Sequence, residues 1–200
     1  MKFFADRPTK TSIPIHVVTK KGLKSWLAKQ NKTSKAWLGS VEFSADKGEV
    51  VLVPGSGGSV SAVVAGAGQD VDTWSYSSLP GKLPKGRYTL AGKLDAEAAT
   101  MAALGWGLGC YRYTEYKSKP SVPKAQLVWP EGCNKREAKR LIEAVTLGRD
   151  LINKPAGDLG PAQIASQVRS LATKHKAKVK SISGQALQKG FPSIHAVGKG

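Results

Sequence analysis

The sequence is poor in the side chains from which metal and disulfide sites are built. Its 200 residues include two cysteines and three histidines. Cys110 and Cys133 are too few for a disulfide framework or a cysteine zinc site, so we expect two reduced thiols. No histidine has another histidine or a carboxylate three or four residues away, the spacing that places two ligands on one helix face. These absences exclude the common zinc motifs.

Acidic residues are also scarce. The sequence has 14 Asp and Glu residues and 31 Lys and Arg residues, which gives a formal net charge of +17. Residues 51–109 carry equal numbers of acids and bases, whereas residues 151–200 carry eight bases and one acid, Asp158. A basic surface attracts polyanions such as nucleic acid. No nucleic-acid module is recognisable, and the bases of the last segment are not interleaved with aromatic residues. The charge indicates a solvated basic surface, with non-specific nucleic-acid contact as the open alternative.

Long apolar runs are missing as well. Asp6, Arg7 and Pro8 stand where a secretory signal needs an apolar stretch. The apolar segment within residues 96–116 is too short and too rich in glycine to cross a bilayer. With 40% hydrophobic and 22% charged residues, the chain is neither disordered nor membrane-spanning. We predict a cytoplasmic protein of one medium domain, or one and a half, with no membrane partner.

The first 130 residues alternate short apolar runs with helical patterns, which is typical of an α/β domain with a mixed sheet flanked by helices. Pro14 cannot donate to a ladder and predicts an edge position for the first strand. The continuous apolar run at residues 50–53 predicts a strand buried on both faces, with residues 60–65 as its hairpin partner. The predicted strands are residues 13–18, 50–53, 60–65, 87–90 and 125–129, and the predicted helices are residues 21–30, 36–38 and 96–116.

Glycine is concentrated in two segments, residues 55–58 and residues 105–109. Residues 55–58, Gly-Ser-Gly-Gly, lack the following Lys-Ser/Thr and the helix start of a phosphate cradle, so we interpret them as a turn. Ser56 is no nucleophile elbow, because Pro54 stands where glycine is needed. The helix that Asp95 caps contains Gly105, Gly107 and Gly109. Their cost in helix propensity predicts a close backbone approach to a neighbouring element.

A domain boundary is predicted near residue 153. Asn134 and Glu137 form a capping-box-like start to a helix through Asn153, whose wide apolar stripe predicts a helix wedged between two domains. Beyond Pro155 we expect a helix from Pro161, a strand at residues 177–182 with three lysines on one face, and a short helix at residues 185–189. Those lysines face solvent or an anionic partner. About fifty residues bury too little surface for a core, so this second unit is expected to be incomplete.

Two segments in this order resemble a known family. Residues 149–161, Arg-Asp-Leu-Ile-Asn-Lys-Pro-Ala-Gly-Asp-Leu-Gly-Pro, and residues 191–200, Phe-Pro-Ser-Ile-His-Ala-Val-Gly-Lys-Gly, resemble the entry into the catalytic domain of leucyl aminopeptidases, the M17 or cytosol aminopeptidases. Residues 104–113 and the helix from Asn134 are similar to the family too. Gly157 stands where the family commonly has asparagine, which changes a local turn interaction.

The resemblance implies a small N-terminal α/β domain at residues 1–130, a linking helix at residues 131–153, and the first elements of a second α/β catalytic domain at residues 154–200. In the family a lysine and several Asp/Glu side chains of the catalytic domain hold two divalent metal ions, Mn or Zn. Lys199 matches an earlier Ala-Val-Gly-x-Gly element and is not such a ligand. The resemblance therefore places no catalytic, metal-binding or substrate-binding residue, and no metal ion, in these 200 residues.

The intact protein is then expected to be a homo-hexameric metallo-aminopeptidase that removes N-terminal residues from peptide substrates, while this chain alone is inactive. Peptide hydrolysis by two metals needs a cluster of carboxylates, and residues 151–200 offer only Asp158. The alternative is a basic polyanion- or DNA-binding regulatory module without peptidase activity. A ligand site on the N-terminal domain would rest on fold analogy alone.

Overall fold

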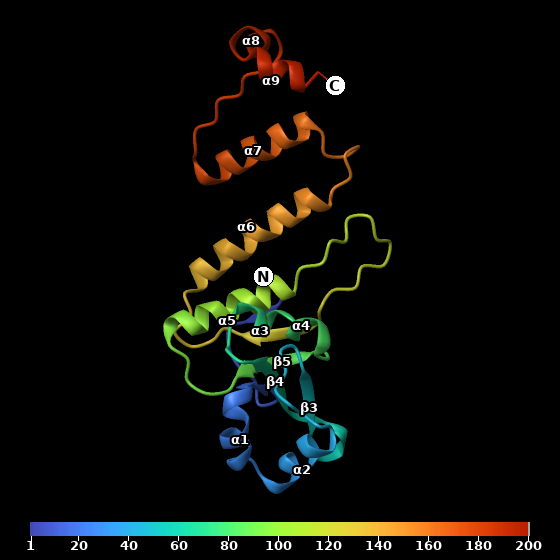
Figure 1. Cartoon of the computed structure of the whole chain (residues 1–200), viewed down its shortest axis with the longest axis vertical. Coiled ribbons are helices and arrows are strands. Elements are labelled where there is room, and N and C mark those ends of the chain that lie inside the picture. Colours follow the sequence, from blue (N-terminus) through green and yellow to red (C-terminus); the bar gives the residue numbers. More distant parts are fainter. Residues whose placement is uncertain (200) are drawn as a thin grey trace. The chain divides into compact units, whose positions relative to one another are not determined.

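The computed structural model describes residues 1–199 and divides after Asp150 into two compact units. The first unit contains a six-stranded sheet in the order β1-β6-β5-β2-β4-β3. Only β3 and β4 pair in antiparallel fashion, so the sheet is mixed, as the sequence predicts. Figure 1 draws the strands as arrows and labels β3, β4 and β5. The strands are β1 (Phe4–Ala5), β2 (Ile13–Thr19), β3 (Val50–Pro54), β4 (Val60–Gly68), β5 (Gly86–Leu90) and β6 (Ala125–Val128).

Helices cover both faces of this sheet, and alternate residues of β4 show the two layers. Val64 packs in a cluster with Leu38 and with partly buried residues of α1. Val63 and Ala65 pack in the larger cluster, with Trp106 and other residues of α3 to α6. This alternation follows from the two-residue period of a strand. The helices of the first unit are α1 (Lys20–Ala28), α2 (Lys32–Ser40), α3 (Thr73–Ser77), α4 (Leu79–Lys82), α5 (Ala96–Gly109) and most of α6 (Lys135–Asn153), within which the unit ends.

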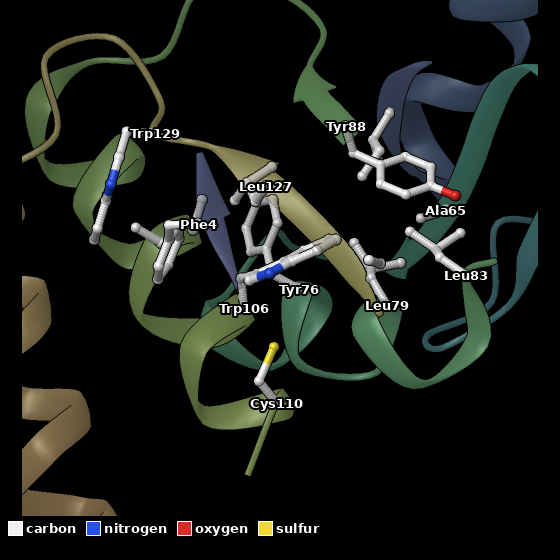
Figure 2. Packing of buried hydrophobic residues seen from close by; sticks show 14 of the residues in the cluster. Phe4, Ala65, Tyr76, Leu79, Leu83, Tyr88, Trp106, Cys110, Leu127 and Trp129 are labelled. Carbon is white, nitrogen blue, oxygen red and sulfur yellow. The ribbon is translucent and has the colours of Figure 1, made fainter. Parts of the chain in front are cut away.

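Trp106 of α5 lies at the centre of the larger core (Figure 2). Its side chain is fully buried, and the indole Nε1 donates to the Phe3 carbonyl oxygen at 3.1 Å. Phe4 stacks on Trp129 with ring centroids 3.7 Å apart. A buried indole needs such a partner for its N–H, because an unpaired polar group in the core costs free energy. The short strand β1 is thereby fixed to both the sheet and α5.

The close approach predicted for the glycines of α5 is confirmed. A Cβ added to Gly105 would lie 2.0 Å from the Thr73 carbonyl oxygen, and one added to Gly109 would lie 1.9 Å from that of Ser77. A Cβ on Gly107 would lie 2.2 Å from the Ile142 side chain of α6. Gly105 and Gly109 are four residues apart and share a helix face. Glycine is therefore what lets α5 contact the backbone of α3.

Two predictions about strands were wrong. β2 is not an edge strand but lies between β5 and β4. Pro14 is tolerated because it is the second residue of β2, and pairing with β4 begins only at Ile15, opposite Val63. The apolar run at residues 50–53 forms the edge strand β3, whose first three residues are only half-buried. Its hairpin partner β4 is more deeply buried, with the last six of its residues in the buried class.

The helix predicted for residues 96–116 begins as expected but ends early. The Asp95 side chain accepts from the Ala98 N–H at 2.8 Å, which confirms the N-cap. The helix ends at Gly109, and Cys110 is its C-cap. Its final carbonyl groups accept hydrogen bonds from arginine side chains. Residues 111–124 then form a loop that leads to β6.

The second unit contains α7 (Pro161–His175), α8 (Gly184–Gly190) and α9 (Pro192–Val197). Pro161 starts α7 as predicted, and α8 confirms the helix expected at residues 185–189. The strand predicted at residues 177–182 is absent, because no strand in residues 151–199 is available to pair with it. Ala172 is the only buried hydrophobic residue that the structure describes in this unit.

Burial of α6 is confined to part of its predicted apolar stripe. The Glu137 N–H donates to the Asn134 side chain at 3.1 Å, so the predicted N-cap is present. Ala138 and Ile142 are buried, whereas Ile152 is 83% exposed. A helix wedged between two domains therefore stays a prediction. No helix within residues 1–199 combines the length and apolar character that a bilayer crossing requires.

Candidate functional site

The described residues do not form a metal centre. Within residues 1–199 no group of three or more His, Cys, Asp or Glu side chains is placed to hold a metal ion. Asp158 lies in the turn between α6 and α7, and Lys199 follows α9. A site for two divalent ions needs several carboxylates. The residues present do not fit that group, and we derive no catalytic step through it.

The cysteines and histidines occupy separate structural positions. Cys110 is buried beneath the end of α5 (Figure 2), and this burial raises the pKa of its thiol to about 12. Burial also raises the pKa of Cys133, which is less enclosed. His16 lies in β2 with its ring 5.3 Å from that of Trp26, and burial lowers its pKa. None of these environments favours a thiolate nucleophile, which needs a lowered thiol pKa.

The Gly-Ser-Gly-Gly segment is a hairpin turn, as predicted. Ser56–Gly58 form a single 3₁₀ turn between β3 and β4, and the Ser59 hydroxyl donates to the Ser56 carbonyl oxygen at 2.7 Å. Gly57 and Gly58 have φ angles of 63° and 77°, which glycine adopts without strain. The segment precedes a strand and not a helix, so it lacks the converging N–H groups of a phosphate cradle.

An open pocket of about 500 Å³ lies at the C-terminal end of α5, and we call it the cationic pocket. Its wall combines the last residues of α5 with residues of α3, α4 and α6 and with the start of the loop after α5. Three cationic side chains contribute to it, and none of the described residues that line it is acidic. The lining residues are Trp74, Ser77, Ser78, Gly81, Lys82, Leu108, Gly109, Tyr111, Arg112 and Arg149.

The two arginines are brought together by the end of α5. Arg149 Nη1 donates to the Leu108 carbonyl oxygen at 3.0 Å, and Arg112 Nη1 donates to that of Gly109 at 3.0 Å and to that of Tyr111 at 2.6 Å. The last carbonyls of a helix lack intrahelical partners and carry partial negative charge. Both arginines thus satisfy helix-end carbonyls while forming part of the pocket wall.

Tyr111 fixes the position of Arg149. Its ring centroid lies 5.3 Å from Arg149 Cζ, a distance typical of a cation–π contact. Its hydroxyl donates to Asp150 Oδ1 at 2.9 Å. Sequence reasoning missed this group, because Arg112 and Arg149 are far apart in the chain and neither stands in a known motif. The unexpected end of α5 at Gly109 is what places them side by side.

A second pocket of about 250 Å³ adjoins the first, since Gly81 and Arg112 line both. It adds Lys85 and Lys124 to the cationic side chains, and again none of its described lining residues is acidic. A third pocket, of about 230 Å³, lies elsewhere and is lined by apolar residues and Tyr76. Arg112 is therefore shared by two pockets that Lys82, Arg149, Lys85 and Lys124 also line.

Comparison with known proteins links the fold to one family. Residues 13–130 match the family model for the N-terminal domain of M17 aminopeptidases. The probable cytosol aminopeptidase of Aeropyrum pernix is 31% identical over 184 residues, which is 87% of this chain and 36% of that protein. That of Rhodococcus opacus is 31% identical over 160 residues, which is 71% of this chain and 32% of that protein. The chain thus spans about a third of the length of these relatives.

Solved structures agree with the match. The cytosol aminopeptidase of Coxiella burnetii is 31% identical with a TM-score of 0.87, covering 98% of this chain and 43% of that one. A manganese complex of the bottromycin maturation enzyme BotP, at 23% identity and a TM-score of 0.65 over 89% of this chain and 40% of that one, shares the fold. The sequence and the architecture lead to the same assignment: the chain belongs to the M17 aminopeptidase family, whose N-terminal domain it carries.

Proposed function

We propose that this chain is the non-catalytic N-terminal part of a two-metal leucyl aminopeptidase. The observation that carries the proposal is the match of residues 13–130 to the family's N-terminal domain, extended by relatives that are named cytosol aminopeptidases. The intact enzyme would release N-terminal amino acids from peptides. Its ions, Mn or Zn, would activate a water molecule and polarise the scissile carbonyl group.

The proposed division of labour follows the two compact units. Residues 1–130 form the N-terminal domain, residues 131–153 the linking helix, and residues 154–200 the start of the catalytic domain. The boundary after Asp150, within α6, supports this division. The exposed Ile164, Val168 and Leu171 on α7 support an incomplete second domain, because these side chains have no core of their own to enter.

The catalytic residues are proposed to lie outside this chain. The match of residues 13–130 to the N-terminal domain of the family supports that view. The N-terminal domain would then shape access to the site and contribute to a homo-hexamer without chemistry of its own. The names of the relatives support a cytoplasmic location. A basic DNA- or polyanion-binding regulatory role remains the alternative, supported by the net charge of +17.

Release of p-nitroaniline from Leu-p-nitroanilide tests the proposal. The 200-residue chain with added Mn²⁺ or Zn²⁺ should give no release above the metal ion alone. The native polypeptide that carries this sequence, purified from its source cells, should release the product and lose activity when a chelator removes the metal. Activity of the chain alone, or an inactive native polypeptide replete with metal, would overturn the proposal.

A further inference from the structure

We propose that the cationic pocket at the end of α5 is a binding site for a small oxyanion, a phosphate- or carboxylate-bearing molecule. Arg112, Arg149 and Lys82 line the cationic pocket of about 500 Å³, and the Lys82 ammonium also donates to the Gly48 carbonyl oxygen. Arg112 also lines the adjoining pocket, together with Lys85 and Lys124. Five cationic side chains therefore line the two adjoining pockets, and none of the described residues that line them is acidic.

The arginines keep donors for a ligand after capping the helix. Each guanidinium has five N–H donors in a planar fork. The hydrogen bonds to helix-end carbonyls use Nη1 of Arg149 and Nη1 of Arg112, and no ion pair in residues 1–199 involves either side chain. The helix end carries about half a negative charge, less than the two full charges of the arginines. The pocket keeps a net positive charge.

Ser78 adds a hydroxyl group that the fold leaves unsatisfied. Its Oγ is buried and has no hydrogen-bond partner among the described residues, although Ser78 stands at the junction of α3 and α4. Buried hydroxyl groups are normally paired, because an unpaired one costs free energy. Ser78 lines the cationic pocket. This lining residue therefore has an unused hydroxyl donor.

The shape of the site favours a compact anion over a long polymer. The cations converge on a hollow, and Gly81 leaves room beside Arg112, since an added Cβ would lie 2.8 Å from Arg112 Nη2. Forked guanidinium groups match the paired oxygens of carboxylates and phosphates. Trp74, which is 55% exposed, forms part of the wall and offers an apolar surface to the rest of the ligand.

Isothermal titration of the 200-residue chain with pyrophosphate and, separately, with citrate tests the site at physiological ionic strength. We expect saturable binding of one molecule per chain for at least one of them. Pyrophosphate alone would identify a phosphate ligand, citrate alone a carboxylate ligand, and both the shared oxyanion chemistry. Binding of neither would overturn the proposal, as would binding of duplex DNA without binding of either small anion.

Three variants make the test specific. Arg112→Gln should weaken binding about tenfold or more, because a charge-assisted hydrogen bond is lost. Gly81→Ala keeps every charge and shifts only the end of the Arg112 side chain, so it should weaken binding less than Arg112→Gln. Lys24→Gln removes the same charge from the exposed face of α1 and should leave binding unchanged. If Arg112→Gln binds normally, or Lys24→Gln weakens binding as much as Arg112→Gln, the pocket is not the site.

Discussion

Gly105 and Gly109 lie where α5 contacts the backbone of α3. Gly105→Ala would place a Cβ 2.0 Å from the Thr73 carbonyl oxygen, a backbone atom that cannot turn away. We predict that the free energy of unfolding falls by about 3 kcal/mol or more, the upper range of overpacking. Urea unfolding followed by tryptophan fluorescence measures the change.

Gly148→Ala is the matched control for this substitution. Gly148 lies inside α6, and an added Cβ would meet nothing within 4 Å. The variant should be more stable by about 0.5–1 kcal/mol, because alanine has the higher helix propensity. Equal effects of the two substitutions would contradict the account of α5 packing.

The thiol of Cys110 makes stability dependent on pH in the alkaline range. Burial raises its pKa from 9.0 to about 12. Below pH 9 the thiol is protonated in both the folded and the unfolded chain, so its contribution to stability is fully present. As the pH rises toward 12 the unfolded thiol ionises first, and the free energy of unfolding should fall by up to about 1.4 kcal/mol per pH unit.

Unfolding measured from about pH 8 to about pH 10 tests this dependence. Cys110→Ala should show a shallower decline than the original chain, even though its stability at neutral pH is lower. Cys133→Ala should change the slope less, because Cys133 is only partly buried. The same slope for Cys110→Ala and the original chain would show that Cys110 is not the titrating group.

Among the elements, α5 depends on its N-cap. The Asp95 carboxylate accepts from the Ala98 N–H at 2.8 Å, and Asp95→Ala should lower the free energy of unfolding by about 1 kcal/mol. Asp70→Ala removes the same charge from an exposed position that caps no helix, and it should have little effect. Comparison of the two thermal unfolding midpoints checks the prediction. Equal shifts would mean that charge, not capping, is responsible.

Local sequence signals located most elements but not their neighbours in the sheet. The Asp95 cap, Pro161 and the short apolar runs placed helix and strand starts correctly, because these signals act within a few residues. The position of β2 depends on which strands lie beside it, and Pro14 misled the prediction for that reason. The run at residues 177–182 has a strand pattern, yet a strand needs a partner that residues 151–199 do not provide.

At the scale of the whole molecule, the net charge follows directly from the sequence. With a net charge of +17, the chain should bind random duplex DNA at low salt and lose most of that affinity at physiological salt. Fluorescence anisotropy with a labelled duplex at several salt concentrations gives the slope. Affinity that persists at physiological salt and depends on the duplex sequence would favour the regulatory alternative over the peptidase account.

The sequence predicted the family, since the resemblance rests on short segments that are read directly. It did not predict the cationic pocket. Arg112, Arg149 and Lys82 come from three different parts of the chain, and only the contacts of α3, α4 and α6 with the end of α5 bring them together. Such a site leaves no local signal in the sequence, because each of these residues alone resembles an ordinary cationic residue of the surface.

The central claim is that this chain supplies the front part of an enzyme whose catalytic residues lie elsewhere. Reading the coding sequence of the native gene onward from Gly200 tests it most directly. The account predicts continuation into a lysine-bearing Val-Gly-Lys-Gly segment followed by Asp-Thr/Ser-Gly-Gly, which would provide metal ligands. A stop codon directly after Gly200 would contradict the peptidase account and leave the basic regulatory module as the better explanation.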